Sequence, residues 1–230
     1  MASGVESSGM RYVAQRLALL VVFACTLFAA AGRLDWPRAW GYLLVVCLLD
    51  IVTLSLLAVL APETLNRRGT MGAGVKPFDK AFAALWLILS LCTAALAGLD
   101  AVRFGWSQLP EFLFGVGALV VTLGVGFGTW AMVVNEHFEQ LVRIQDDRAH
   151  CVVTSGPYRL IRHPGYLGFI VGALATPGML GSAWTFVPAG LLVLLVVVRT
   201  HLEDGVLRRE LPGYEEYTRQ TRFRLVPLIW

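Results

Sequence analysis

The sequence predicts an all-α fold, a polytopic membrane helical bundle that ends in a helical hairpin and a cytoplasmic cap over a polar pocket. Hydrophobic residues make up 57% of the 230-residue chain and charged residues 15%, against about 45–50% and about 25% in soluble domains. Several uncharged runs are long enough to cross about 30 Å of hydrocarbon. The basic residues are also distributed unevenly between the loops that join these runs.

Four membrane spans are predicted in residues 1–135, which we treat as an N-terminal transmembrane region. They cover residues 17–32, 39–61, 81–99 and 112–135. For the first span a cleaved signal peptide is an alternative, because Arg11 and Arg16, a short apolar core and the alanines 29–31 resemble the three regions of such a peptide.

Asp50 interrupts the second span, and a carboxylate at that depth is costly unless it has a partner or a function. We favour a protonated or hydrogen-bonded packing role over a functional one. Glycines 124, 126 and 128 in the fourth span could suggest a nucleotide-binding loop. Because no strand precedes them, we interpret them as sites of close helix packing.

The four cysteines predict neither a disulfide framework nor a zinc site, since no CxxC pair occurs. Cys25, Cys47 and Cys92 lie in apolar runs, and we expect them to be buried, inert thiols. The net charge is only +3 and the basic residues form no stripe, which argues against a nucleic-acid partner. No metal and no obligate protein partner is predicted.

Residues 164–198 form an uncharged run of 35 residues, longer than one span requires. Thr176, Pro177 and Gly178 near its middle favour a reversal. We therefore predict a hairpin of two short helices, residues 166–176 and 184–198, with Gly168 and Gly172 allowing tight packing. Such a hairpin returns both ends to one membrane face, where Arg162 and His163 would meet Arg199, His201 and Glu203.

Residues 154–166 form a polar, proline-punctuated segment directly before this run. Pro157 and Pro164 disfavour helical dihedrals in the preceding residues, so Gly156 and His163 should adopt extended or turn geometry. Arginine and carboxylate groups beside a lipid-lined groove suit an amphiphilic substrate with an anionic head and a soluble charged cofactor. His163 by itself could equally be a structural loop residue.

The basic residues fix the predicted orientation. With the N-terminus inside, 16 of the 19 lysines and arginines lie on the cytoplasmic side, and only Arg33, Arg38 and Arg103 lie outside. This imbalance follows the positive-inside rule. It places the polar segment and the C-terminal residues 199–230 in the cytoplasm. No Gly-x-Ser-x-Gly, HExxH or Walker motif occurs, which disfavours acyl-enzyme, zinc-hydrolase and P-loop chemistry.

An ordered series of short motifs fills the C-terminal half. It runs His150-Cys151-Val152-Val153-Thr154-Ser155-Gly156-Pro157-Tyr158, Arg162-His163-Pro164-Gly165-Tyr166-Leu167-Gly168, Arg199 with Glu203, Pro212-Gly213-Tyr214 with Tyr217, and Arg224-Leu225-Val226-Pro227. The series resembles the isoprenylcysteine carboxyl methyltransferase family and, in its Arg-His-Pro-x-Tyr-x-Gly element and acidic pair, the related phospholipid methyltransferases. The resemblance covers roughly residues 136–230, which we therefore expect to be the catalytic region.

The resemblance implies transfer of a methyl group from S-adenosyl-L-methionine, leaving S-adenosyl-L-homocysteine, to a lipid-like acceptor in the bilayer. By similarity, the residues expected to bind the cofactor are His150, Val152, Val153, Thr154, Ser155, Tyr158, Arg162, His163, Pro164, Gly165, Tyr166 and Glu203. The expected catalytic residues are Arg199, His163 and Arg162, with Arg199 positioning an acceptor carboxylate. Asp204 stands where many relatives carry a second glutamate.

Three other functions stay open at the level of sequence. Phospholipid N-methylation would need His163 or Glu203 to remove a proton from an amine, whereas a carboxylate acceptor needs no base. Membrane sterol and isoprenoid reductases have a similar C-terminal loop and hairpin and use NADPH. A non-catalytic lipid-binding or scaffold subunit is the third alternative.

Overall fold

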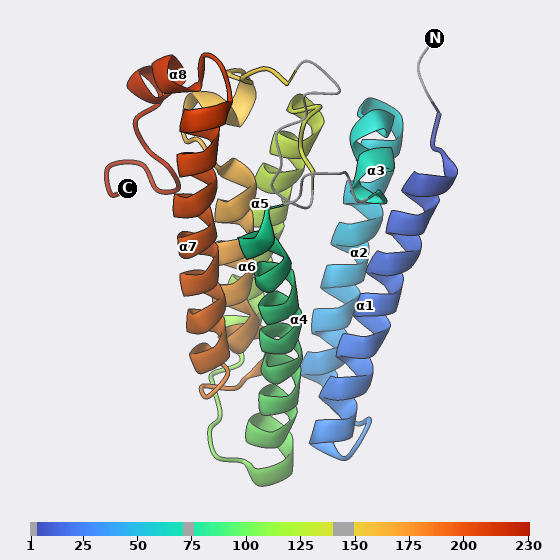
Figure 1. Cartoon of the computed structure of the whole chain (residues 1–230). Coiled ribbons are helices and arrows are strands. Elements are labelled where there is room, and N and C mark those ends of the chain that lie inside the picture. Colours follow the sequence, from blue (N-terminus) through green and yellow to red (C-terminus); the bar gives the residue numbers. More distant parts are fainter. Residues whose placement is uncertain (1–3, 71–75, 140–149) are drawn as a thin grey trace.

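The computed structural model describes residues 4–70, 76–139 and 150–230, and within these ranges it contains helices, turns and no strand (Figure 1). The predicted all-α class is therefore confirmed. The elements, in chain order, are α1 (Ser7–Ala31), α2 (Pro37–Leu60), α3 (Pro62–Arg68), α4 (Pro77–Gly98) with a π-helical continuation (Leu99–Phe104), α5 (Phe112–Val134), a short 3-10 helix (Gly156–Arg159), α6 (Pro164–Leu180), α7 (Phe186–Glu210) and α8 (Tyr214–Gln220).

Five of these helices are long and apolar enough to cross a membrane: α1, α2, α4 with its continuation, α5 and α7. The four spans predicted in residues 1–135 each correspond to one of them. Many of their large apolar side chains point outward and are exposed, as expected where the surrounding medium is hydrocarbon. The chain is a multi-pass integral membrane protein.

This outward apolar surface corrects the prediction for the cysteines. Cys25 and Cys92 are exposed and Cys47 is partly exposed, so none of the three is buried within the bundle. An apolar run of a membrane helix does not need protein around every side, because lipid satisfies the outer face. The packing role favoured for Asp50 agrees with the structure, in which its carboxylate lies 2.5 Å from the Arg16 guanidinium of α1.

Glycines bring α5 and α6 close together. A Cβ added at Gly168 would lie 2.6 Å from the carbonyl oxygen of Gly124, and one added at Gly117 would lie 2.6 Å from the Met179 side chain. The predicted packing role of glycines 124, 126 and 128 thus holds at Gly124 and was wrong at Gly126, where an added Cβ would meet nothing within 4 Å. The close approach at Gly117 was not predicted. The predicted role of Gly172 was wrong, since a Cβ there would meet nothing, and Gly168 approaches α5 rather than its hairpin partner.

The predicted hairpin is present as α6 and α7. Its reversal lies later than predicted: α6 continues through Pro177 and ends at Leu180, followed by the capping residue Gly181, whose φ of +80° favours glycine. The Asp100 carboxylate fixes the turn by accepting hydrogen bonds from the Ser182 hydroxyl at 2.6 Å and from the Trp184 backbone N–H at 3.1 Å. The turn therefore lies against the end of the third span.

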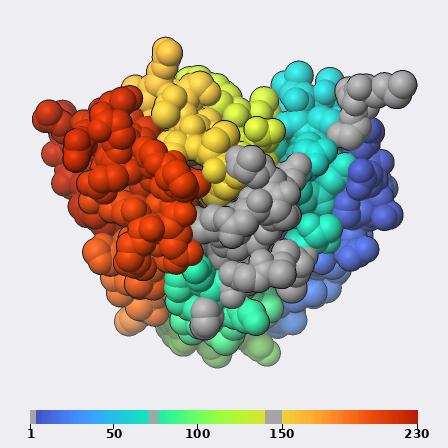
Figure 2. All heavy atoms as spheres, turned by 45° about the horizontal axis from the view of Figure 1, so that its top comes forward, coloured from blue at the N-terminus to red at the C-terminus, as the bar shows by residue number. Residues whose placement is uncertain are grey.

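The two ends of the bundle differ in character. The α6–α7 turn lies at one end, whereas the N-terminus, α3, α8 and the C-terminus gather at the other (top in Figure 1). On that end the C-terminal segment adjoins residues 150–165 (Figure 2). Backbone N–H groups of Arg162 and His163 donate to the carbonyls of Phe223 and Arg224 at 2.9 Å each, which attaches the tail to the polar segment.

Candidate active site

A pocket of about 830 Å³, including its open mouth, lies at this end of the bundle. Eleven of the predicted site residues line it: His150, Val152, Val153, Tyr158, Arg162, His163, Pro164, Gly165, Tyr166, Arg199 and Glu203. Thr154 and Ser155 do not, and their side chains are exposed.

The polar segment owes its shape to Gly156 and the two prolines. Gly156 has φ +57°, and a Cβ there would also lie 3.1 Å from Val134, so both backbone and space favour glycine. The chain then makes the 3-10 helix that buries Tyr158. His163, at φ −125° and ψ 62°, precedes Pro164, the first residue of α6. The predicted departure from right-handed helical dihedrals is confirmed at both residues: His163 lies outside any helix, and Gly156 begins the 3-10 helix with a positive φ.

Arg162 is held on several sides. Its Nε and Nη2 contact the two carboxylate oxygens of Asp204 at 2.8 and 3.2 Å. Its Nη1 donates to the carbonyls of Thr221 and Arg222 at 2.9 and 2.8 Å. Both side chains of the Arg162–Asp204 pair are almost fully buried. Asp204 itself does not line the pocket, so this pair joins the loop, α7 and the tail.

One side of the pocket carries the Glu203 carboxylate, with His163 and Tyr166 beside it. The Tyr166 hydroxyl donates to Glu203 Oε2. The His163 ring stacks on the Tyr166 ring with centroids 5.5 Å apart, and its Nδ1 lies 4.0 Å from Glu203 Oε1. The Glu203 side chain keeps 19% of its surface exposed, which leaves its carboxylate accessible from the pocket.

Arg199 lies one helical turn before Glu203 and is paired with Asp79 of α4. Its Nε and Nη2 lie 2.9 and 3.0 Å from the two Asp79 oxygens. The guanidinium also lies over the rings of Phe82 and Tyr166, at 4.2 and 5.1 Å from their centroids. The predicted meeting of Arg162 and His163 with Arg199 and Glu203 across the hairpin is confirmed, since all four line the pocket. The prediction was wrong for His201, which is exposed and does not line the pocket.

Tyrosines close the pocket on its outer side. The Tyr217 hydroxyl donates to the Tyr158 carbonyl at 2.7 Å, and Asn135 donates to the Tyr158 hydroxyl at 2.9 Å. Burial raises the pKa of Tyr158 and Tyr214, and raises the pKa of Tyr217 to about 12. These phenols therefore stay neutral at physiological pH. The predicted C-terminal cap is present in α8 and the residues around it.

Comparison with known proteins shows which family the pocket region resembles. Residues 117–209 match the model of the isoprenylcysteine carboxyl methyltransferase (ICMT) family. This region of the chain is similar to the ICMT family. It begins within α5 and ends in the last turn of α7, so it contains the polar segment, the hairpin, Arg199 and Glu203.

Two of the following relatives are named for isoprenylcysteine O-methylation and one is named for metal resistance. A "Probable protein-S-isoprenylcysteine O-methyltransferase" of rice (Oryza sativa) is 31% identical over 118 residues, covering 49% of this chain and 62% of the relative. The "Protein-S-isoprenylcysteine O-methyltransferase" of Schizosaccharomyces pombe is 34% identical over 113 residues, covering 43% and 48%. The "Cobalt-zinc-cadmium resistance protein CzcN" of Cupriavidus metallidurans is 35% identical over 122 residues, covering 49% and 56%. The chain thus spans about half to three-fifths of these relatives.

Several residues that line the pocket, and Asp79, which contacts the lining residue Arg199, were not predicted from the sequence. Asp79 lies outside the ICMT region, and only its acidic character at the start of a span could have drawn attention to it. Tyr214 and Tyr217 belonged to a recognised motif but had no assigned role. The other lining residues that were not predicted as site residues are Asn135, His137, Phe138, Glu139, Cys151, Leu207 and Leu211.

Proposed function

We propose that the chain is a membrane carboxyl O-methyltransferase that uses S-adenosyl-L-methionine and methylates the carboxylate of an isoprenylcysteine-like or other lipid-like acceptor. The observation that carries the proposal is the placement of Arg199 and Glu203 one turn apart on α7, both lining one pocket where the hairpin returns to its polar flank. The two charges suit an anionic acceptor and a cationic donor in the same site.

The pocket fits the cofactor by the chemistry of its lining groups. S-adenosyl-L-methionine supplies a methyl group on a sulfonium. Glu203 offers an accessible carboxylate and the Tyr158 ring lines the pocket; a carboxylate and an aromatic ring are groups that attract cations such as a sulfonium. His150, Val152 and Val153 would complete the wall. Thr154 and Ser155 would contribute only by rearranging, because their side chains are exposed.

Arg199 would orient the acceptor. The Asp79 carboxylate and the Phe82 and Tyr166 rings fix the plane of its guanidinium, so an acceptor carboxylate meets a preorganised cation. A carboxylate is already the nucleophile at pH 7 and needs no general base. The protein would then align the acceptor carboxylate with the sulfonium methyl. It would also exclude water from these two opposite charges, which neutralise each other as the methyl is transferred.

Arg162 and His163 would act differently from each other. Because Asp204 and two carbonyls engage Arg162, we assign it to positioning the loop rather than to contact with the reacting atoms. His163 lies beside Glu203 and would hold that carboxylate in place. By the distribution of basic residues, the pocket would face the cytoplasm, where a soluble cofactor has access.

Two variants test the proposal. Glu203→Ala should abolish binding of S-adenosyl-L-methionine in calorimetry, whereas Arg199→Ala should retain binding and lower turnover by about 100-fold or more. His201→Gln, an exposed position on the same helix, is the matched control. Turnover would be measured with labelled cofactor and either a farnesylcysteine analogue or phosphatidylethanolamine. Normal activity in both variants would refute the assignment. If only phosphatidylethanolamine were methylated, the acceptor group would be an amine and not a carboxylate.

A further inference from the structure

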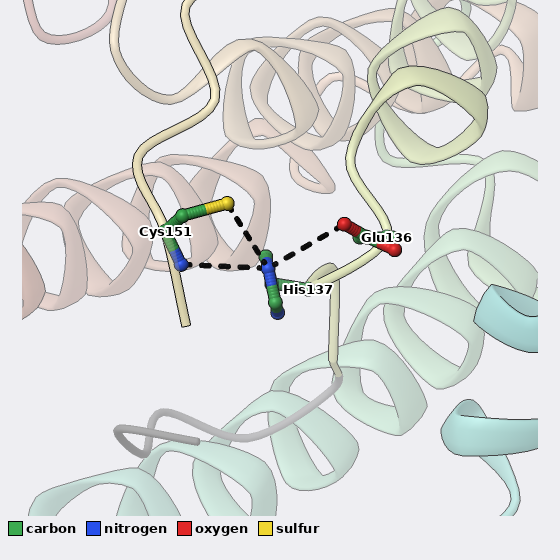
Figure 3. Close-up of side chains that lie close together, drawn as sticks. All are labelled: Glu136, His137 and Cys151. Atoms are coloured by element: carbon green, nitrogen blue, oxygen red, sulfur yellow. Dashed lines mark hydrogen bonds and ion pairs between the residues drawn. The ribbon is translucent and has the colours of Figure 1, made fainter. Parts of the chain in front are cut away.

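A second group of reactive side chains lies at the rim of the pocket, on two segments that flank residues 140–149. His137 follows α5, and Cys151 lies in the extended segment that leads to Gly156. Figure 3 shows the Cys151 and Glu136 side chains directed at the His137 ring from opposite sides. His137 is buried, with 8% of its surface exposed, whereas Glu136 and Cys151 are accessible from solvent.

All three partners approach the same ring nitrogen. His137 Nε2 lies 3.6 Å from the Cys151 Sγ, 3.8 Å from Glu136 Oε1 and 3.5 Å from the Cys151 backbone nitrogen. A single imidazole nitrogen either donates one hydrogen or accepts with one lone pair, so it cannot serve a thiol, a carboxylate and an N–H together. The distances also lie at or beyond the long end of hydrogen bonds.

The same distances suit a shared metal ion. With bonds of about 2.0–2.1 Å to nitrogen and about 2.3 Å to sulfur, tetrahedral geometry places the two ligand atoms about 3.5 Å apart. The observed separation of nitrogen and sulfur is 3.6 Å, and the three ligand atoms lie within 4.8 Å of one another. Small side-chain rotations would therefore bring all three into bonding distance.

We propose that Glu136, His137 and Cys151 form a site for a borderline-soft divalent cation of the Zn²⁺ type, a site beyond the methyl-transfer function proposed above. A thiolate, a carboxylate and a neutral imidazole carry two negative charges, which a divalent cation neutralises. Three protein ligands leave a fourth position for water. The ion would join the turn after α5 to the segment before Gly156, and so fix the rim of the pocket.

Cobalt substitution tests this site without any activity measurement. Full-length protein without a polyhistidine tag, purified in detergent and stripped with a chelator, would be titrated with Co²⁺. One equivalent should give tetrahedral visible bands and a sulfur-to-cobalt charge-transfer band, which Zn²⁺ then displaces. Cys151→Ser should remove the charge-transfer band. His137→Gln should weaken Zn²⁺ binding by at least about 100-fold, and Glu136→Gln by about 10-fold.

The chain supplies matched controls. Cys92→Ser and His201→Gln change an exposed cysteine and an exposed histidine away from the cluster, and both should bind Co²⁺ as the wild type does. Because Cys151 is itself exposed, its serine variant should fold even if His137→Gln does not. Absence of the charge-transfer band in the wild type, or its persistence in Cys151→Ser, would overturn the proposal while leaving the methyltransferase assignment untouched.

Discussion

Two buried carboxylates, Asp204 and Asp79, each hold an arginine of the pocket, and they do so in different ways. Asp204 accepts from Arg162, Arg208 and Arg224 at 2.8–3.2 Å, and so gathers cations from the loop, α7 and the tail. Asp79 reaches from α4 to Arg199 of α7 with a paired contact of 2.9 and 3.0 Å. One carboxylate thus organises a cluster, whereas the other orients one side chain.

The difference separates a folding role from a positioning role. Removing the charge of Asp204 would leave several cations without a shared partner, one of them, Arg162, almost fully buried. Removing the charge of Asp79 would chiefly change how one pocket arginine is directed. The Asp204 cluster lies largely within the ICMT region and the tail, while Asp79 connects that region to the N-terminal spans.

Asp204→Asn should have the largest effect on stability. Breaking a buried ion pair by removing one partner costs about 3–5 kcal/mol, because the remaining charge stays buried. Thermal unfolding of the purified protein in detergent would measure the loss. Glu203→Gln changes the neighbouring, partly exposed carboxylate and should unfold close to the wild-type temperature. An Asp204→Asn protein as stable as the wild type would show that the cluster contributes no stability.

Asp79→Asn should mainly affect the acceptor, provided that the proposed function holds. A misdirected Arg199 would lower kcat/KM for the acceptor by about 10- to 100-fold, since small displacements of a positioning group have effects of this size. The affinity for S-adenosyl-L-methionine should stay unchanged in calorimetry. Asp35→Asn, an exposed carboxylate at the other end of the bundle, serves as the control. An equal loss of cofactor affinity would indicate a general structural defect instead.

The sequence correctly predicted those parts of the site whose geometry depends on residues close together in the chain. The uncharged 35-residue run with Pro177 and Gly178 predicted the hairpin, and the hairpin by itself brings His163 to Glu203. Pro157 and Pro164 predicted the non-helical loop, because their effect on the preceding residue is local. For these residues, geometry followed from neighbours in the sequence.

The remaining features depend on packing between distant segments. Asp79 meets Arg199 across 120 residues, and no local pattern specifies which spans lie side by side. Cys25 and Cys92 occupy apolar runs, but the face of the helix decides between protein and lipid. Thr154 and Ser155 lie in an otherwise correctly predicted segment, and their outward direction depends on how the extended chain is oriented over the pocket.

The variant Tyr217→Phe should make the stability of the folded protein less sensitive to alkaline pH. The pKa of Tyr217 is raised to about 12, above the value of about 10 for an exposed phenol. The stability gained by burying the neutral phenol is therefore complete below pH 10 and is lost as the pH rises to about 12, up to about 2 kcal/mol. Burial also raises the pKa of Tyr158 and Tyr214, so the effect of Tyr217 is measured as the difference between the variant and the wild type.

Thermal unfolding at pH 8 and at pH 11 would show this difference. The melting temperature should fall less between the two pH values in Tyr217→Phe than in the wild type. The Tyr217→Phe variant should also be slightly less stable at pH 8, because it loses the hydrogen bond to the Tyr158 carbonyl. Equal decreases in both proteins would mean that Tyr217 does not couple its ionisation to folding.

Lys76→Gln should have the smallest effect on stability and turnover, and it is the most direct comparison for Asp79→Asn. Lys76 and Glu210 form a second pair between the start of α4 and the end of α7, with Nζ 2.9 Å from the carboxylate, but their side chains are 28% and 39% exposed. Exposed pairs contribute about 0–1 kcal/mol and are screened by salt. We expect a small change in unfolding temperature and unchanged kcat/KM. If Lys76→Gln instead lowered acceptor turnover as Asp79→Asn does, docking of α4 on α7, rather than the orientation of Arg199, would control the reaction.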